Sequence, residues 1–205
     1  MGKTNVNGRR SCAKTNNEPA AANSAPCCTA DSSCCGPEQP ANQPRRLEIE
    51  FLYLDLSVCT RCQGTKSTLE EAIAEAARVL EATGIQVTVR NIHVQTEEQA
   101  RELGFVSSPT IRINGKDIQL DVKESLCESC GDLCGEDVDC RVWVYQGREY
   151  TVPPRAMIIE AILREVYGGA DEIPEATRQI KDVPDNLKRF FAARRKKEAD
   201  NCMPG

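Results

Sequence analysis

The feature that most constrains the fold is the motif Cys-Thr-Arg-Cys at residues 59–62, because it stands directly between an apolar run and an amphipathic segment. The run at 47–57, LEIEFLYLDLS, is apolar on both faces, which is typical of a central strand covered on both sides. The segment 65–83 has apolar residues at helical spacing and a capping box formed by Ser67 and Glu70. The two cysteines are therefore predicted to lie where a strand gives way to a helix.

The remaining pattern predicts alternating strands and helices. Residues 85–94 alternate as a strand, and residues 96–103 form a short capped helix. Asn114-Gly115 and Gln146-Gly147 each separate two alternating runs, which indicates two hairpins. A last amphipathic helix follows Pro153-Pro154. The pattern is that of one α/β domain.

Composition divides the chain into three parts. Residues 1–46 hold almost no large apolar side chains, so we expect a disordered, cysteine-containing arm. Residues 47–168 carry the periodic pattern and form the expected domain, with 121–140 as a cysteine-rich loop. Residues 169–205 are expected to form a linker and a short basic helix.

Charge and hydropathy bear on partners and localisation. The formal net charge is -5, so we expect no nucleic-acid partner. No run of about 18 apolar residues exists, and the N-terminus lacks the apolar region of a secretory signal. We therefore expect a cytoplasmic protein without a transmembrane segment, whose thiols stay reduced unless they are working. Phe190 and Phe191 of the basic helix are expected to dock on the acidic domain, with a membrane-surface helix as the alternative.

The order strand, C-x2-C, helix, strand, helix, proline, hairpin, helix resembles the thioredoxin superfamily. The residues that carry the resemblance are the motif at 59–62 and the segment GFVSSPT at 104–110. It implies an α/β thioredoxin-like fold, with a mixed central sheet flanked by helices, to which this chain adds a hairpin and the cysteine-rich loop. It also implies that Pro109 follows a cis peptide bond and packs against the cysteine pair. The buried acid that thioredoxins carry before the pair has its nearest substitute in Asp55.

The same resemblance implies a thiol–disulfide oxidoreductase. A thiol at a helix N-terminus is favoured as its thiolate, and Arg61 would add to that effect. Cys59, as the more exposed sulfur, would attack a protein or small-molecule disulfide, and Cys62 would resolve the mixed disulfide beside Pro109. This chemistry requires no cofactor. The alternative for the pair is that it supplies two ligands of a structural zinc.

The 121–140 segment carries a dense second set of thiols. These are Cys127, Cys130, Cys134 and Cys140. In the thioredoxin arrangement, residues after Leu120 emerge near Cys59, so the loop can fold over the first pair. As free thiols they would exchange disulfides with that pair. As ligands they would hold zinc, As(III) or an iron–sulfur cluster bridging both C-x2-C pairs. The same spacing is also compatible with a purely structural zinc knot or with structural disulfides.

Two vicinal pairs stand in the N-terminal arm. They are Cys27, Cys28, Cys34 and Cys35. Exposed thiols are oxidation liabilities, whereas two adjacent thiols can bind one thiophilic ion such as As(III) or Hg(II). In combining vicinal cysteines with a thioredoxin-like core, the chain resembles the metallochaperones of arsenical-resistance systems. The alternative function is therefore binding or delivery of a thiophilic metal or metalloid, although drift in an unselected tail would also produce such an arm.

Overall fold

The computed structural model describes residues 45–135, 137–168 and 180–201. The chain divides into two units, Met1–Asn42 and Gln43–Gly205, and every described residue belongs to the second. This unit is an α/β structure with a mixed sheet and flanking helices. The expected arm, apart from Arg45 and Arg46, and most of the expected linker lie outside the described residues.

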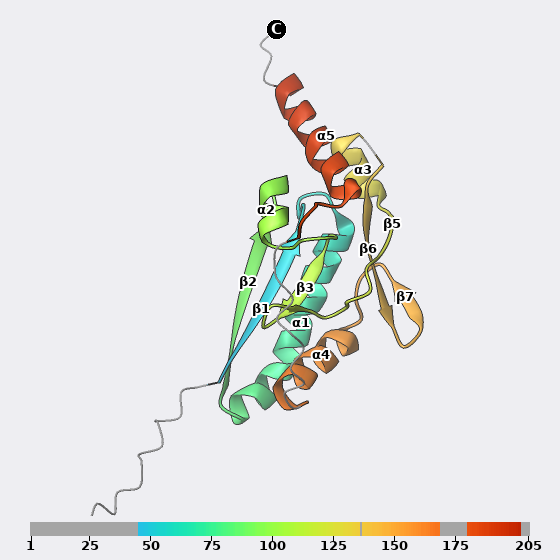
Figure 1. The fold of residues 1–205 in the computed structure, drawn as a ribbon. Coiled ribbons are helices and arrows are strands. Elements are labelled where there is room, and N and C mark those ends of the chain that lie inside the picture. The colour runs from blue at the N-terminus through green and yellow to red at the C-terminus, as the bar shows by residue number, and fades with distance from the viewer. Residues whose placement is uncertain (1–44, 136, 169–179, 202–205) are drawn as a thin grey trace, which may run out of the picture. The chain divides into compact units, whose positions relative to one another are not determined.

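The main sheet has the strand order β2-β1-β3-β4 (Figure 1). Strand β1 (Arg45–Tyr53) pairs in parallel with β2 (Ile85–His93) and antiparallel with β3 (Thr110–Ile113). Strand β3 in turn pairs antiparallel with β4 (Lys116–Asp117). Strand β1 is therefore central, as its apolar run predicts, and its buried side chains contribute to the cores on both faces of the sheet.

Strand β1 ends earlier than the sequence predicts, at Tyr53. The chain turns after it because the carboxylate of Asp55 accepts hydrogen bonds from the backbone N–H groups of Ser57 and Val58, at 2.7 and 2.9 Å. This turn delivers Cys59 to the start of the first helix. It is a local polar interaction, and the hydrophobic pattern carries no trace of it.

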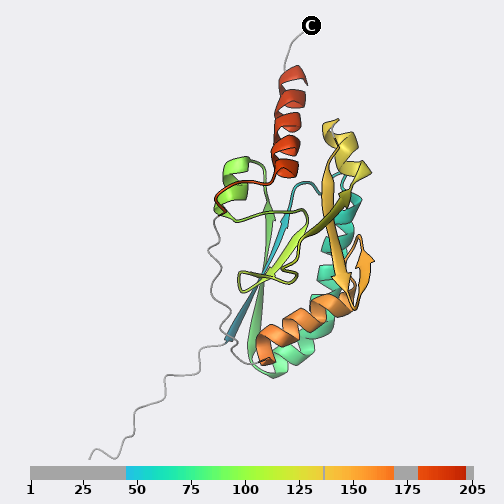
Figure 2. The same cartoon turned by 45° about the vertical axis from the view of Figure 1, so that its right-hand side comes forward.

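Helices α1 (Thr60–Ala82) and α4 (Arg155–Tyr167) pack together on one face of the sheet in Figures 1 and 2. Helix α1 begins at Thr60 rather than after a cap at Ser67, which corrects the predicted start. The early turn contains Gly64, a poor helix former, where a Cβ atom would lie 2.7 Å from Cγ2 of Val152. Close packing against Val152 therefore favours glycine at position 64. The same glycine lowers the local helix propensity, so the sequence pattern does not show that the helix begins this early.

Helix α2 (Glu97–Glu102) starts where the sequence predicts. The side chain of Thr96 accepts a hydrogen bond from the backbone N–H of Gln99, at 3.2 Å. The predicted hairpin turns are confirmed as well, because Asn114-Gly115 and Gln146-Gly147 have positive φ angles. The second of these turns joins β6 (Asp139–Tyr145) to β7 (Arg148–Tyr150), where Trp143 is buried.

The segment 121–140 is not a loop. It contains strand β5 (Lys123–Leu126), helix α3 (Glu128–Cys134) and the start of β6. Strand β5 pairs antiparallel with β6, giving a small sheet in the order β5-β6-β7. Gly135, in the left-handed conformation, ends α3. The strand that pairs with β5 follows α3 in the sequence, so the local residue pattern does not indicate that β5 is a strand.

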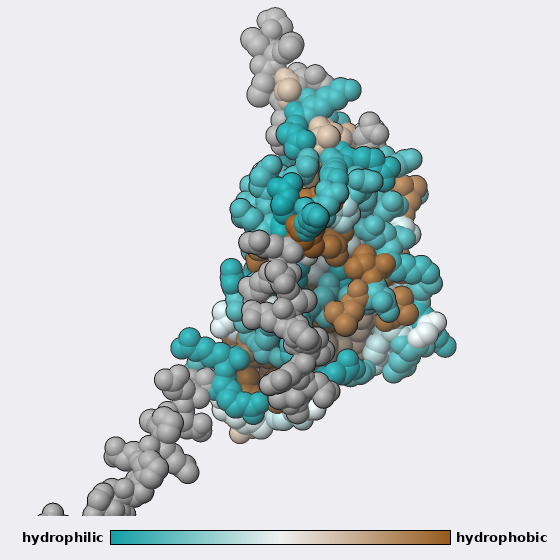
Figure 3. All heavy atoms as spheres, viewed as in Figure 1, coloured by the Kyte–Doolittle hydropathy of each residue, from teal (hydrophilic) through white to brown (hydrophobic). Residues whose placement is uncertain are grey.

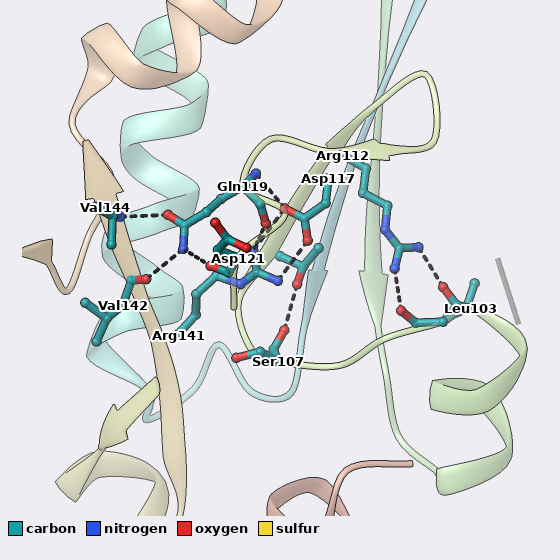
Figure 4. Close-up of polar contacts among 11 residues, drawn as sticks. Leu103, Ser107, Arg112, Asp117, Gln119, Asp121, Arg141, Val142 and Val144 are labelled. Atoms are coloured by element: carbon teal, nitrogen blue, oxygen red, sulfur yellow. Dashed lines mark hydrogen bonds and ion pairs between the residues drawn. The ribbon is translucent and has the colours of Figure 1, made fainter. Parts of the chain in front are cut away.

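A buried polar network joins the two sheets (Figure 4). The fully buried guanidinium of Arg141 on β6 contacts both carboxylate oxygens of Asp117 on β4, at 2.9 and 2.8 Å. The side-chain amide of Gln119 donates to Val142 O and accepts from the N–H of Val144. These bonds hold β6 against the edge of the main sheet and so fix the position of Cys140, the residue before Arg141.

Helix α5 (Asp185–Asn201) packs on the α/β body beside α3 and α2. Leu187, Phe190 and Phe191 on its inner side are almost fully buried, so the predicted docking of the phenylalanines is confirmed. The helix presents mainly hydrophilic residues outward (Figure 3). None of the helices in the described ranges has the length and apolar character needed to cross a membrane.

Candidate metal centre

Four cysteine sulfurs meet where the N-terminus of α1 faces the small sheet. All four Sγ atoms lie within 4.8 Å of one another, and we call this group the four-cysteine cluster. Its members are Cys59, Cys127, Cys130 and Cys140. The Sγ atoms of Cys59 and Cys127 are 4.0 Å apart, and those of Cys130 and Cys140 are 3.4 Å apart. One sulfur comes from the main domain body and three come from the β5–α3–β6 segment.

Backbone structure holds each sulfur in place. Cys59 is the N-cap of α1, where its sulfur accepts a hydrogen bond from the N–H of Cys62, at 3.4 Å. Cys127 precedes α3, and its N–H donates to the carbonyl of Val138 at 2.8 Å. Cys130 lies in α3, and Cys140 pairs with Ser125 in the β5–β6 ladder. Each of the four cysteines therefore lies in a helix or strand or directly before a helix.

Two cysteines near the cluster are not part of it. Cys62 Sγ lies 3.4 Å from Ser108 Oγ, and Cys134 Sγ donates to the carbonyl of Cys130 at 3.1 Å. The group of sulfurs close enough to hold one metal ion therefore contains Cys59 and not Cys134, which the predicted set had included. Cys134 follows Cys130 by four residues, which places it about 6 Å further along the helix axis. The vicinal cysteines at 27, 28, 34 and 35 lie outside the described residues.

All six cysteines of the described residues are buried, and none of them forms a disulfide there. Cys59 and Cys62 are both 0% exposed. Cys59 is therefore not the exposed thiol that the resemblance implies. The segment 121–140, which the sequence predicts can fold over the first pair, forms much of the small sheet, and this sheet together with α5 accounts for the burial of Cys59.

Hydrogen bonds among the thiols lower the pKa values of some of them and raise those of others. Bonds from Cys127, Cys130 and Cys140 lower the pKa of Cys59 far below its ordinary value. Bonds from Cys130 and Cys140 lower the pKa of Cys127 to about 7. In return, the bond to Cys127 raises the pKa values of Cys130 and Cys140, and the bond to Cys59 with burial raises that of Cys62. Without a cation the cluster therefore keeps protons that a bound metal ion would replace.

The surroundings of the cluster exclude water. The apolar residues of α5, Leu187, Phe190 and Phe191, belong to the same buried core as the six cysteines. Lys197 of α5 donates to the carbonyls of Asp132 and Leu133 at the end of α3. Helix α5 is therefore a cover over the cysteines. The sequence indicated it only through two phenylalanines within a basic helix.

The loop before Cys59 and the segment opposite Cys62 are both ordered by hydrogen bonds. The Ser108–Pro109 peptide bond is cis, as the resemblance implies. Ser108 Oγ accepts from the N–H of Leu54, and its carbonyl accepts from the N–H of Arg141. Asp55 is 8% exposed, and although burial tends to raise its pKa, bonds from Val58 and Ser57 with the charge of Arg194 lower it overall. The contact of Ser108 with Cys62 is long-range; the resemblance implies that the next residue, Pro109, packs against the pair, but not that Ser108 contacts Cys62.

The single histidine is not a ligand candidate. His93 Nε2 bonds to the carbonyl of Leu54 at 2.8 Å, and its Nδ1 lies 3.0 Å from Nε2 of Gln95. Both ring nitrogens therefore have partners within the protein.

The site lies inside a recognised sequence family. A family model described as a domain of unknown function, DUF2703, matches residues 47–162. The chain belongs to this family. Comparison with curated proteins gives no match, and comparison with solved structures gives none either. The matched part of the DUF2703 chain includes the whole four-cysteine cluster, whereas α5 lies beyond it.

Proposed function

We propose that this DUF2703 chain binds one thiophilic metal ion in four-coordinate geometry at the four-cysteine cluster, with Zn²⁺ as the leading candidate. The observation that carries the proposal is the convergence of four buried sulfurs within 4.8 Å of one another. In a tetrahedral zinc–thiolate site with bonds near 2.3 Å, neighbouring sulfurs are about 3.8 Å apart. The separations of 4.0 and 3.4 Å lie on either side of that value.

Energetics support a bound cation. Four thiolates buried together are costly, because burial penalises each charge and the four charges repel one another without a central cation. A divalent ion converts that repulsion into four favourable bonds, and the apolar side chains of α5 keep competing water away. The span is suited to a single ion, because a cluster with several irons needs its thiolates further apart.

The ion class follows from the donor set. Four thiolates suit Zn²⁺ and other soft ions that accept tetrahedral sulfur, including Hg²⁺. As(III) takes three thiolates, so it would leave one sulfur of the cluster unused. Because the chain resembles arsenic metallochaperones, As(III) is the competing candidate ion, and the test includes it.

The test measures metal content on the full chain. Anaerobically purified protein is stripped of metal, loaded separately with Zn²⁺ and As(III), and weighed by native mass spectrometry. We expect one retained Zn²⁺ per chain, loss of retention in Cys140→Ser, and normal retention in Cys134→Ser, the matched control from the same segment. A chain that retains no metal ion, or loses it equally in both variants, would contradict the proposal.

A second candidate is the thiol–disulfide oxidoreductase, which is favoured by the position of Cys59 as N-cap with Cys62 one turn later. Cys59 thiolate would attack a substrate disulfide RSSR, releasing one RS⁻ and forming a mixed disulfide. Cys62 thiolate would then attack Cys59 sulfur, releasing the second RS⁻ and leaving a Cys59–Cys62 disulfide. The two electrons pass to the substrate, and a dithiol reductant returns the pair to thiols.

The oxidoreductase interpretation requires the metal-free form and access to a buried sulfur. Its test is reduction of oxidised glutathione by the stripped chain with dithiothreitol as the reductant. Cys59→Ser abolishes turnover above the uncatalysed rate if the pair is the active site. Turnover that is unchanged by this substitution would rule out the pair.

A thioredoxin-like fold is part of the same proposal. The strand order β2-β1-β3-β4, with only β1 and β2 parallel, supports it, as do the helix between those strands and the cis bond before Pro109. The β5–α3–β6 segment with β7 would then be an insertion between β4 and α4 that brings three metal ligands to the usual position of the cysteine pair.

A further inference from the structure

Arg61 stands between the two cysteines of the first pair, yet its side chain reaches across to the small sheet. Its Nη1 donates to the carbonyl and to Oγ of Ser125, at 3.2 and 3.0 Å, and to the carbonyl of Cys140 at 3.2 Å. Its Nη2 donates to the carbonyl of Leu126 at 2.6 Å. All the acceptors belong to β5 and β6, the strands that lead into Cys127 and contain Cys140.

We propose that Arg61 is a positioning residue of the metal site, which holds Cys59 against the three cysteines of the β5–α3–β6 segment. This inference rests on the proposed metal-binding function and adds the element that closes the site. Three ligands come from one continuous segment, whereas the fourth comes from the start of α1. Something must keep these two parts in register for four-thiolate coordination.

Arg61 is suited to this task because its planar guanidinium offers several donors in a fixed arrangement. A second polar contact joins the N-terminal turns of α1 and α3, between Thr60 Oγ1 and Ser129 Oγ, but it is a single exposed bond between neutral groups. Arg61 also brings a positive charge to the backbone of one ligand, Cys140, where four thiolates and one divalent ion would leave a net negative charge.

The test uses Co²⁺ as a probe, because tetrahedral Co²⁺ bound by thiolates absorbs through sulfur-to-metal charge transfer in proportion to the number of thiolates. We compare the wild type, Arg61→Ala, Arg61→Lys and Cys59→Ser on the full chain. For Arg61→Ala we expect affinity for Co²⁺ about 10- to 100-fold weaker, as is typical when an outer partner of a metal ligand is removed. At saturation we expect its charge-transfer intensity to fall to that of Cys59→Ser.

The saturated spectrum separates positioning from general destabilisation, since a merely weakened fold would recover the four-thiolate spectrum once enough metal is bound. Arg61→Lys keeps the charge but not the fork, so we expect it to resemble Arg61→Ala. If Arg61→Lys shows the wild-type spectrum and affinity, the inference is overturned, because a positive charge at this position would then be sufficient. Arg155→Ala, which removes exposed ion pairs between α4 and α1, is the control and is expected to match the wild type.

The outcomes also separate this inference from the proposed function. If the wild type binds no Co²⁺, metal binding itself fails. If the wild type gives a four-thiolate spectrum and Arg61→Ala gives the same spectrum and affinity, only the role of Arg61 is overturned.

Discussion

The two C-x2-C pairs of this chain have the same spacing and the same position at the start of a helix, but they contribute differently. The second pair gives both sulfurs to the four-cysteine cluster, whereas the first gives only Cys59. Cys62 instead faces Ser108, in the segment that leads to Pro109. The difference shows that the environment of a pair, and not its spacing, decides whether both of its sulfurs or only one of them joins the cluster.

The physical reason lies in what each helix packs against. Helix α3 is short and faces β6 with Cys140, so both of its first cysteines meet a third sulfur. Helix α1 is long and packs on one face of the main sheet, and its first turn contacts both the segment around Ser108 and the small sheet. The following experiments break or sharpen this contrast.

Substituting one cysteine of each pair gives the largest expected difference. Cys130→Ser removes a ligand of the cluster, so we expect loss of the stoichiometric metal ion that native mass spectrometry detects. Cys62→Ser leaves the four sulfurs intact and is expected to retain one ion. Equal loss of metal from both variants would mean that the two pairs act alike.

The ion pair between Arg141 and Asp117 holds β6, and with it the second cysteine pair, against the main sheet. Removing this ion pair is expected to lower the free energy of unfolding. Asp117→Ala leaves the guanidinium of Arg141 buried without its counterion, which typically costs about 3 to 5 kcal/mol of unfolding free energy. Chemical denaturation measures this change. Glu149→Ala, which removes only an exposed pair with Lys123, is expected to cost less than about 1 kcal/mol. Similar costs for the two variants would show that the network does not hold the small sheet in place.

The stability that Asp55 contributes through the loop before Cys59 is expected to depend on pH. The pKa of Asp55 is lowered in the folded chain, so its carboxylate stabilises the fold above its unfolded pKa of about 3.9. That stability is lost as pH falls through the lower folded value. Asp55→Asn should flatten this acid-side loss and cost about 1 to 3 kcal/mol at pH 7, because charge-assisted hydrogen bonds are removed. Denaturation curves from pH 2 to 7 that are parallel for both proteins would contradict this role.

The smallest effect is expected from the hydroxyl contact between the two helix starts. Thr60 Oγ1 and Ser129 Oγ lie 3.2 Å apart at the surface. Thr60→Ala should therefore change the unfolding free energy by less than about 1 kcal/mol and leave metal retention unchanged. A large loss of metal in this variant would transfer to Thr60 the role assigned to Arg61.

Local sequence signals predicted the framework of the molecule well. The apolar run of β1, the Thr96 cap and the two Asn-Gly and Gln-Gly turns each depend on neighbouring residues, so they are visible without the fold. The approach of the second cysteine segment to Cys59 has a different basis, because it was predicted from the strand directions of the thioredoxin arrangement that the chain resembles.

The composition of the site was less predictable, because it depends on long-range contacts. Strand β5 exists through its pairing with β6 across an intervening helix, and that helix turns Cys134 away from the other sulfurs. The burial of Cys59 depends on the small sheet and on α5, which joins the site from the far end of the chain. Spacing alone therefore identified candidate cysteines but did not predict which four sulfurs lie together.

The most direct test of four-thiolate binding is X-ray absorption at the zinc K-edge on the full chain loaded with one equivalent of Zn²⁺. We predict a shell of four sulfur atoms at about 2.3 Å, and the same shell in Cys62→Ser. A shell dominated by nitrogen and oxygen, or zinc that is lost when excess metal is removed, would contradict the claim that Cys59 joins the second cysteine segment in a single metal site.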